Sequence, residues 1–371
     1  MAIFNIDGNI ISAEDGSTVT PFYDFPALKY YFNDSVYESG LNRYNLFTMA
    51  HISDLHNDPT RYDRFLKFAS VNASFIDACA VTGDFVDIPT SAAFAEMTAK
   101  ETYDNVDILK CVGNHEKKYS TTSMTNSQIY NNWGLVTNTA KVYYYKDYAD
   151  YNIRVIAINP YDTDSNEADS HYTQTQIDWF INTLKSAITA GYAVIVLRHN
   201  FDGAKTVSNK NGFYQRFYWW DGHFTSDLKC SGTPIEDIVH AFQTGGSITQ
   251  TYTYSDGVPS ISVDTSFSSA GHFIAYLVGH YHADLTGYSP KYSNQLYLTV
   301  PQGVFASTIR SGSWTTASDL PRVENTRTQD AFNLYSFDTT HRTVKVCRVG
   351  SDTNDLLQKR SMTTFAYNGA S

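Results

Sequence analysis

Metal-ligating residue types recur in short motifs along this 371-residue chain. Asp54-Leu55-His56 and His280-Tyr281-His282 each place two such residues one position apart. In an extended segment alternate side chains point the same way, so both members of each pair can reach one ion. The candidate metal ligands are Asp54, His56, Asp84, Asn114, His199, His280 and His282. Nitrogen and oxygen donors without thiolate suit two divalent or trivalent ions of manganese, iron or zinc.

Asp84 is the candidate for a ligand that two ions share. It follows Gly83 at the end of an apolar run, and the two oxygens of a carboxylate can bridge a pair of cations. Two ions about 3.5 to 4 Å apart would clamp a phosphate oxygen and supply a metal-bound hydroxide for in-line attack. These donors therefore indicate metal-dependent hydrolysis of a phosphoester.

Apolar runs that we predict as strands precede all of these motifs. The runs cover residues 46–52, 77–81, 106–112, 193–197 and 273–278. Side chains at the ends of neighbouring strands converge, so the motifs are expected to meet at one site. Gly279, just before the second His pair, is expected to allow a sharp turn.

Two helices are predicted beside these strands. Residues 61–71 carry apolar side chains at helical spacing. A second helix is expected after Thr173, because Thr173 and Gln176 have the spacing of a capping box. A further strand is predicted at 151–158, and a strand at 295–300 and a hairpin at 332–348 complete the sheets.

The order of the motifs resembles that of the calcineurin-like metallophosphoesterase family: D-x-H, G-D, G-N-H-E, a lone His and G-H-x-H, over residues 46–350. The resemblance implies an α/β fold, a four-layer sandwich of two mixed β-sheets flanked by helices. It places Asp54, His56 and His282 on one ion, and Asn114, His199 and His280 on the other. Asp84 would lie between the ions. His115 would be the general acid, with Asp87 orienting it and Glu116 in a supporting role.

The chain also departs from the family pattern. Asn57 and Asp58 stand where the family often has glycine, and Ile88 and Pro89 replace the Arg and Gly of the protein-phosphatase branch. The missing arginine weakens a protein-phosphatase assignment. The leading expectation is a phosphodiesterase that acts on a small or nucleotide-like substrate. The alternatives are a phosphomonoesterase or protein phosphatase, and a non-catalytic binding or virion-associated module.

The predicted organisation has an N-terminal extension at 1–45, the phosphoesterase domain at 46–350 and a C-terminal tail at 351–371. Residues 201–270 interrupt the strand pattern and are interpreted as an insertion, whose aromatic run at 213–220 forms either a small core or a wall for the substrate. The histidines outside the motifs are interpreted as structural: His51, His171, His223, His240, His272 and His341. Arg198 is expected to point away from the site.

The composition of the chain indicates which kinds of molecule it is expected to bind. The net charge of −11 argues against a broad nucleic-acid-binding face, so a small phosphoester is the expected substrate. Four scattered cysteines fit buried thiols better than disulfides. Neither a signal peptide nor a membrane span is visible in the sequence, and a cytoplasmic location without membrane contact is expected.

Overall fold

The computed structural model describes most of the chain. The described residues are 3–4, 10–12, 46–163, 170–200, 230–280, 282–284, 287–289, 291–300, 303–304, 308–311, 318–324, 329–350 and 362–367. Most of the expected N-terminal extension and the aromatic run at 213–220 lie outside them, as does His223. Within the extension, β1 (Ile3–Phe4) and β2 (Ile10–Ser12) pair with each other.

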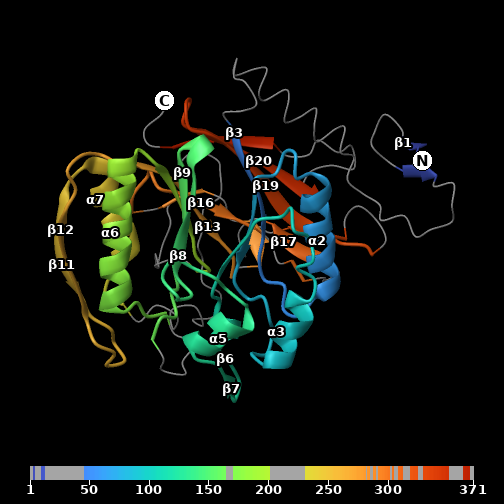
Figure 1. The fold of residues 1–371 in the computed structure, drawn as a ribbon, viewed down its shortest axis with the longest axis horizontal. Coiled ribbons are helices and arrows are strands. Elements are labelled where there is room, and N and C mark those ends of the chain that lie inside the picture. The colour runs from blue at the N-terminus through green and yellow to red at the C-terminus, as the bar shows by residue number, and fades with distance from the viewer. Residues whose placement is uncertain are drawn as a thin grey trace.

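Two six-stranded sheets form the centre of the molecule (Figure 1). The first has the order β21-β20-β19-β3-β4-β5, and the second has the order β15-β16-β13-β10-β9-β8. The strands of the first sheet are β3 (Leu46–Ile52), β4 (Ala78–Thr82), β5 (Ile108–Cys111), β19 (Ala331–Asp338), β20 (Thr343–Gly350) and β21 (Met362–Ala366). Those of the second are β8 (Tyr144–Tyr148), β9 (Ile153–Ala157), β10 (Ala193–Leu197), β13 (His272–Val278), β15 (Gly287–Tyr288) and β16 (Leu296–Thr299).

The strands that end in the sequence motifs run parallel within each sheet. In the first sheet β3, β4 and β5 are parallel, and in the second β9, β10, β13 and β16 are parallel. Antiparallel strands complete both sheets, so each sheet is mixed. Because parallel strands end at the same edge, this arrangement brings the motifs together.

Three apolar layers hold the four structural layers together. Side chains from both sheets, such as Phe47, Leu109 and Leu277, share one buried cluster between the sheets. The helix α2 (Pro59–Val71) covers the outer face of the first sheet, and α3 (Ser91–Thr98) and α5 (Asn126–Asn132) join the same apolar cluster at one end of it. The helices α6 (Gln174–Ala190) and α7 (Pro234–Thr244) cover the outer face of the second. The four-layer sandwich expected from the sequence is confirmed.

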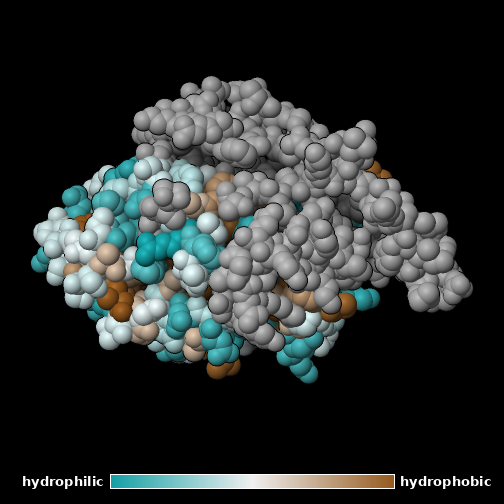
Figure 2. Space-filling model, turned by 90° about the horizontal axis from the view of Figure 1, so that it is seen from above, coloured by the Kyte–Doolittle hydropathy of each residue, from teal (hydrophilic) through white to brown (hydrophobic). Residues whose placement is uncertain are grey.

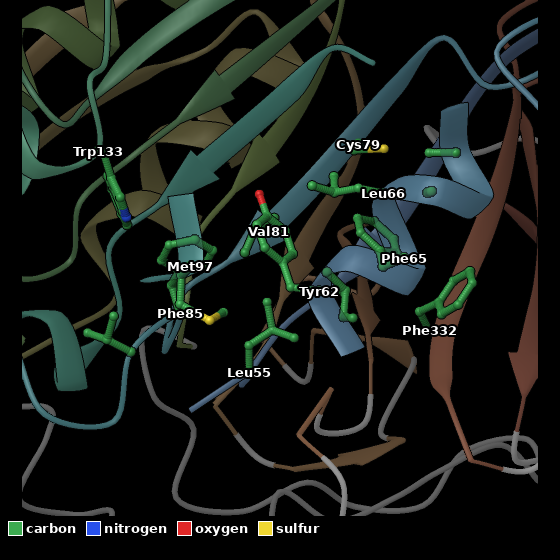
Figure 3. Packing of buried hydrophobic residues seen from close by; sticks show 14 of the residues in the cluster. Leu55, Tyr62, Phe65, Leu66, Cys79, Val81, Phe85, Met97, Trp133 and Phe332 are labelled. Carbon is green, nitrogen blue, oxygen red and sulfur yellow. The ribbon is translucent and has the colours of Figure 1, made fainter. Parts of the chain in front are cut away.

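Helix α2 shows how the sequence produces this packing. Tyr62, Phe65 and Leu66 recur at the spacing of one helical face and lie against Val81 and Phe332 of the sheet (Figure 3). The helix begins with Pro59 at its first turn, and the Asp58 side chain accepts a hydrogen bond from the Arg61 N–H at 3.0 Å.

Helix α6 begins at the predicted place, but the predicted capping box is wrong. Thr173 accepts from the Gln176 N–H at 3.3 Å, as an N-cap residue does. The buried Gln176 side chain instead bonds both backbone groups of Asn159, at 2.7 and 2.9 Å. An amide buried beside the end of β9 finds complementary peptide groups there, so it does not turn back to its own helix.

Two boundaries differ from the sequence interpretation. The segment 201–270 contains α7 and the hairpin β11 (Ser247–Tyr252)–β12 (Ile261–Ser266), whose apolar side chains join the core around α6. Their periodicity is that of ordinary structural elements, so 233–266 is part of the core of the domain rather than an insertion. Strand β21, within the expected tail, pairs antiparallel with β20 and extends the first sheet.

The described part of the face shown in Figure 2 is mostly hydrophilic, and the cysteines are free thiols, as the composition suggests. Hydrophilic residues prevail on the coloured part of the face in Figure 2, and hydrophobic ones are scattered. None of the helices in the described part of the chain has the length and apolar character needed to cross a bilayer. All four cysteines are free, and Cys79, Cys111 and Cys347 are buried.

Candidate metal centre

The seven candidate ligands meet where the two sheets end. Their donor atoms form two groups, each compact enough to surround one ion. The first group is Asp54, His56, Asp84 and His282, and the second is Asp84, His199 and His280. The side-chain oxygen of Asn114 lies 3.1 Å from His199 Nε2 and joins the second group. Asp84 is common to both.

In the first group the imidazole nitrogens face each other. His56 Nε2 lies 3.0 Å from His282 Nε2, and His282 Nε2 lies 3.3 Å from Asp54 Oδ1. Asp84 Oδ2 is 3.8 Å from His56 Nε2. The Asp54 carboxylate also accepts the His280 N–H at 3.0 Å, which ties the two strand ends together.

The second group is built around His199. Its Nδ1 lies 2.6 Å from the Thr82 carbonyl, so Nδ1 carries the hydrogen and Nε2 faces the centre. Nε2 is 3.3 Å from Asp84 Oδ1 and 3.1 Å from His280 Nδ1. A main-chain carbonyl therefore fixes both the orientation and the tautomer of this candidate ligand.

The donor set fits two cations of the predicted kind. Two buried carboxylates and four imidazoles converge without thiolate, and several nitrogen lone pairs are directed at the same two points. Burying this many ionisable groups together is costly unless positive charge lies among them.

The backbone at the ligands is not extended, so the expected reason for their convergence is wrong. Five of them have φ in the left-handed region: Asp54 (54°), His56 (42°), Asp84 (49°), His280 (71°) and His282 (52°). Each such residue costs about 1–3 kcal/mol, and such strain gathers at functional sites. Main-chain bonds from Asp54 N to Gly83 O (3.1 Å) and from His56 N to Asp84 O (2.9 Å) hold the turns in place.

Glycines allow the turns to approach one another closely. The chain bends directly after Gly279, but His280, with a φ of 71°, takes the left-handed conformation rather than the glycine. Gly279 is needed for space, because a Cβ there would collide with the Ser53 hydroxyl. Gly83 combines a φ of 88° with contact against His199. A Cβ at Gly113 would collide with Asp84.

Glu116 supports the turn that carries Asp84. It is buried and accepts backbone N–H groups from Gly113 at 2.6 Å, Asp84 at 2.9 Å and Val86 at 3.1 Å. Burial raises the pKa of Glu116 to about 7, and the Asp84 carboxylate adds to the rise. Glu116 is therefore a positioning residue.

His115 lies beside the first group with one nitrogen occupied. Its Nδ1 is 2.8 Å from the Asp87 carbonyl and 3.3 Å from Asp87 Oδ1, and its backbone N–H donates to Asp84 Oδ1 at 3.0 Å. Nδ1 must carry a hydrogen to donate to the carbonyl, so Nε2 faces the centre, 4.0 Å from Asp84 Oδ2. A proton can be transferred at Nε2.

Asp87 contacts two imidazoles. Its Oδ1 lies 3.4 Å from His56 Nδ1 as well as 3.3 Å from His115 Nδ1. These three residues are close enough to surround an ion. However, both Nδ1 atoms carry hydrogens when the Nε2 atoms face the centre, so Asp87 is better described as an acceptor that orients both rings.

Comparison with known families assigns the domain. Residues 47–226 match the calcineurin-like phosphoesterase family. The chain contains a calcineurin-like phosphoesterase domain. It is accordingly a metal-dependent phosphoric ester hydrolase, as the motif order predicts.

Solved structures that are similar to this chain differ widely from it in sequence. A dimetal phosphatase from Danio rerio is 10% identical, with a TM-score of 0.50, over 86% of this chain and 99% of that one. A predicted phosphoesterase from Streptococcus pneumoniae is 11% identical, with a TM-score of 0.34, over 86% and 97%. At 10% identity the likeness to the dimetal phosphatase supports the fold alone. Comparison with curated proteins gave no match.

The charges in the phosphoesterase centre are coupled. Burial alone would lower the pKa of His199, but the Asp84 carboxylate raises it to about 9. Burial opposes ionisation of Asp84, yet His199 and His56 hold its pKa well below the usual value. A cation that binds at His199 must displace a proton.

Those residues predicted to stay outside the centre that the structure describes do so. Arg198 is buried and donates to the Tyr172 hydroxyl at 2.9 Å. His171 Nε2 lies 2.6 Å from Asp256 Oδ2, and His240 stacks on Tyr292 with ring centroids 4.2 Å apart. His341 bonds Asp338, and the exposed His272 lies beside Arg342.

His51, also outside the centre, is buried between Thr82 and Tyr335, at 2.7 and 3.0 Å.

Asn57, noted as a departure from the family pattern, has a definite role. Its φ of 62° lies in the region that glycine also favours, and its side chain accepts the Asp87 N–H at 2.8 Å. Asparagine therefore meets the same backbone requirement as glycine and also fixes Asp87.

A second set of main-chain contacts, not predicted from the sequence, supports Asp54. Gly303 N donates to the Ser53 carbonyl at 2.7 Å, and Val304 N donates to the Asp54 carbonyl at 3.0 Å. The buried Arg322 guanidinium donates to the carbonyls of Val304 (2.7 Å) and Gly303 (3.3 Å). Gly303 just after a predicted strand was the available signal, whereas nothing in the sequence links Arg322 to this turn.

Proposed function

We propose that this chain is a phosphodiesterase that hydrolyses small or nucleotide-like phosphoesters at a dinuclear metal centre. The observation that carries the proposal is the meeting of seven nitrogen and oxygen donors in two groups that share Asp84, with His115 beside them. Manganese, iron or zinc suits these donors.

Each side chain has a definite task. Asp54, His56 and His282 would hold one ion, Asn114, His199 and His280 the other, and Asp84 both. When bound, the two cations would neutralise the phosphoryl oxygens and activate water for attack. His115 would place a proton on the departing oxygen from Nε2, while Asp87 keeps Nδ1 occupied.

The charge near the centre favours a diester over a monoester. A phosphomonoester dianion benefits from an arginine beside the ions, but Ile88 and Pro89 replace the residues of the protein-phosphatase motif. Arg198, next to His199 in sequence, is turned into the core toward Tyr172. A diester carries one negative charge less and needs less compensation.

The overall charge favours a small substrate. A net charge of −11 repels extended polyanions, so a nucleic acid or an anionic membrane is disfavoured as a partner. The two cations would provide the local attraction for a small anionic phosphoester.

A non-catalytic binding or virion-associated module is the second candidate. Such a module needs the fold but not a proton donor aimed at the centre. The orientation of His115 through Asp87 therefore supports a hydrolase.

The test is metal analysis and turnover of metal-reconstituted protein. We expect bis(4-nitrophenyl) phosphate to be hydrolysed faster than 4-nitrophenyl phosphate. Asp84→Asn should lose at least one equivalent of metal and activity on the order of a hundredfold or more, because both ions share this carboxylate. Asp338→Asn, in the β19–β20 turn, is the matched control and should keep both.

Each part of the proposal can fail separately. Normal metal content and turnover in Asp84→Asn would contradict the assigned metal site. Preference for the monoester would support a phosphomonoesterase, and metal binding without turnover of either ester would support the non-catalytic module.

A further inference from the structure

An exposed aromatic ring lies against the proposed proton donor. The ring of Tyr119 stacks on that of His115, with centroids 4.9 Å apart and planes inclined by 26°. Tyr119 nevertheless stays 43% exposed, whereas His115 is 18% exposed. A large aromatic ring that served only the core would be buried. Tyr119 therefore offers a surface to solvent at the edge of the centre.

The hairpin that carries Tyr119 keeps it near His115. Strands β6 (Lys118–Tyr119) and β7 (Thr122–Ser123) follow the short helix α4 (Asn114–Lys117) directly. The Met124 N–H donates to the Lys117 carbonyl at 2.9 Å and closes the base of the hairpin. In Figure 1 the hairpin projects at the end of the molecule where α3 and α5 also lie.

The geometry around His115 decides which part of a substrate would meet Tyr119. His115 Nδ1 is held by Asp87, and the His56 ring meets the His115 ring edge-on, with centroids 4.6 Å apart. Nε2 is directed at the centre, where the departing oxygen would receive its proton. The group attached to that oxygen then extends outward beside the ring pair of His115 and Tyr119.

The exposed side chains here are suited to a flat, uncharged group. Tyr119 provides an aromatic ring, and Ile88, which follows Asp87 in the chain, is also exposed. Aromatic rings bind one another by offset stacking or edge-to-face contact.

We propose that Tyr119 forms a subsite for the leaving group and binds an aromatic ring carried on the departing oxygen, directly or through a short link. This inference rests on the proposed hydrolase function. It makes aryl or heteroaryl esters the preferred substrates among small phosphodiesters.

The test separates ring stacking from leaving-group acidity. Two methyl phosphodiesters are compared, one with a phenyl leaving group and one with a fluorinated alkyl leaving group of similar pKa. Tyr119→Leu should lower kcat/KM for the phenyl ester about three- to tenfold more than for the fluoroalkyl ester, the range expected for one aromatic pair. Tyr119→Phe keeps the ring and should keep the preference. Val136→Ala, an exposed apolar truncation in another loop, is the control.

Binding without turnover gives a second measurement. Calorimetry should show that methyl benzylphosphonate, in which a methylene replaces the departing oxygen of the methyl phenyl diester, loses more affinity in Tyr119→Leu than methyl cyclohexylmethylphosphonate, which has similar size but is not flat. Equal losses for both ligands and both esters would mean that Tyr119 only supports His115, and the subsite would be withdrawn. Absence of turnover by the metal-loaded wild type would overturn the hydrolase itself, whereas turnover with an unchanged preference in Tyr119→Leu overturns the subsite alone.

Discussion

The two halves of the candidate metal centre are built differently. We call Asp54, His56 and His282 the outer half-site, and Asn114, His199 and His280 the inner half-site. His282 is 38% exposed, whereas His199 is 0% exposed. His56 is oriented by the partly exposed carboxylate of Asp87, but His199 is oriented by the main-chain carbonyl of Thr82.

This difference assigns separate tasks to the two halves. A ligand held by buried backbone cannot turn away without breaking the sheet edge, so the inner half-site is preorganised. The outer half-site opens toward solvent and lies beside His115, 4.6 Å between the ring centroids of His56 and His115. Substrate entry and proton transfer are therefore expected on the outer side.

The largest expected effect concerns His115, on the outer side. If His115 protonates the departing oxygen, His115→Ala should slow esters with poor alkoxide leaving groups by about a hundredfold to ten-thousandfold. Esters of nitrophenol, which leaves almost without a proton, should slow much less. The measurement is kcat/KM against leaving-group pKa, with metal counted in each sample.

Metal content should remain near normal in His115→Ala, because Asn114 rather than His115 is the proposed ligand. A uniform fall across all leaving groups would assign His115 to phosphate positioning or metal support. The general-acid role would then be withdrawn.

The second effect compares the ions directly. We expect a chelator to remove the outer ion at least about tenfold faster than the inner ion, since loss of a supporting contact alone changes metal affinity by about 10–100-fold. His282→Ala should keep one tightly held equivalent. His199→Ala should lose that tight equivalent. Release of both ions at the same rate from the wild type would contradict the prediction that the inner half-site holds its ion more tightly.

Much of this centre was predictable because only a few residue types can bind metal ions. Strand β3 has the predicted bounds, and Asp54, Asp84 and His199 follow strands as expected. In an extended segment alternate side chains point the same way, and this rule did not predict the left-handed backbone at Asp54. Side chains that converge on one point can override the local preference of the backbone.

Contacts between residues that are far apart in the sequence could not be predicted either. Gly279 is required by Ser53, more than two hundred positions away, and Arg322 supports the turn after Ser53 through Gly303. Helix α7 was hidden because it follows a segment without a clear period, although its own apolar residues recur at helical spacing. Partners that are remote in sequence leave no local signal.

A smaller effect tests the carboxylate on the outer side. Asp87→Asn should give a milder form of the His115→Ala pattern, on the order of severalfold to tenfold, because the Asp87 carbonyl remains 2.8 Å from His115 Nδ1. It should also weaken the outer ion, since Asp87 Oδ1 lies 3.4 Å from His56 Nδ1. The measurements are the leaving-group series and the rate of chelation. An effect confined to the inner ion would contradict this placement of Asp87.

The last effect concerns stability rather than rate or metal binding, and it lies on the inner side, where His51 supports Thr82. Its Nε2 is 2.7 Å from the Thr82 hydroxyl, and the Thr82 carbonyl in turn orients His199. Burial lowers the pKa of His51 from 6.5 to about 3. Between these values the unfolded chain binds a proton that the folded chain does not, so the free energy of unfolding falls as the pH falls.

His51→Asn should remove this dependence. The wild type should lose about 1.4 kcal/mol of unfolding free energy per pH unit more than the variant as the pH falls from 6.5 toward 3, and the difference should be flat above 6.5. Denaturant unfolding of metal-free protein at several pH values measures it. Tyr335→Phe removes a partner of His51 but keeps the imidazole, so it should keep the wild-type slope. Parallel pH profiles for wild type and His51→Asn would show that His51 takes up its proton without unfolding the inner side, and Thr82 would then not depend on a neutral imidazole.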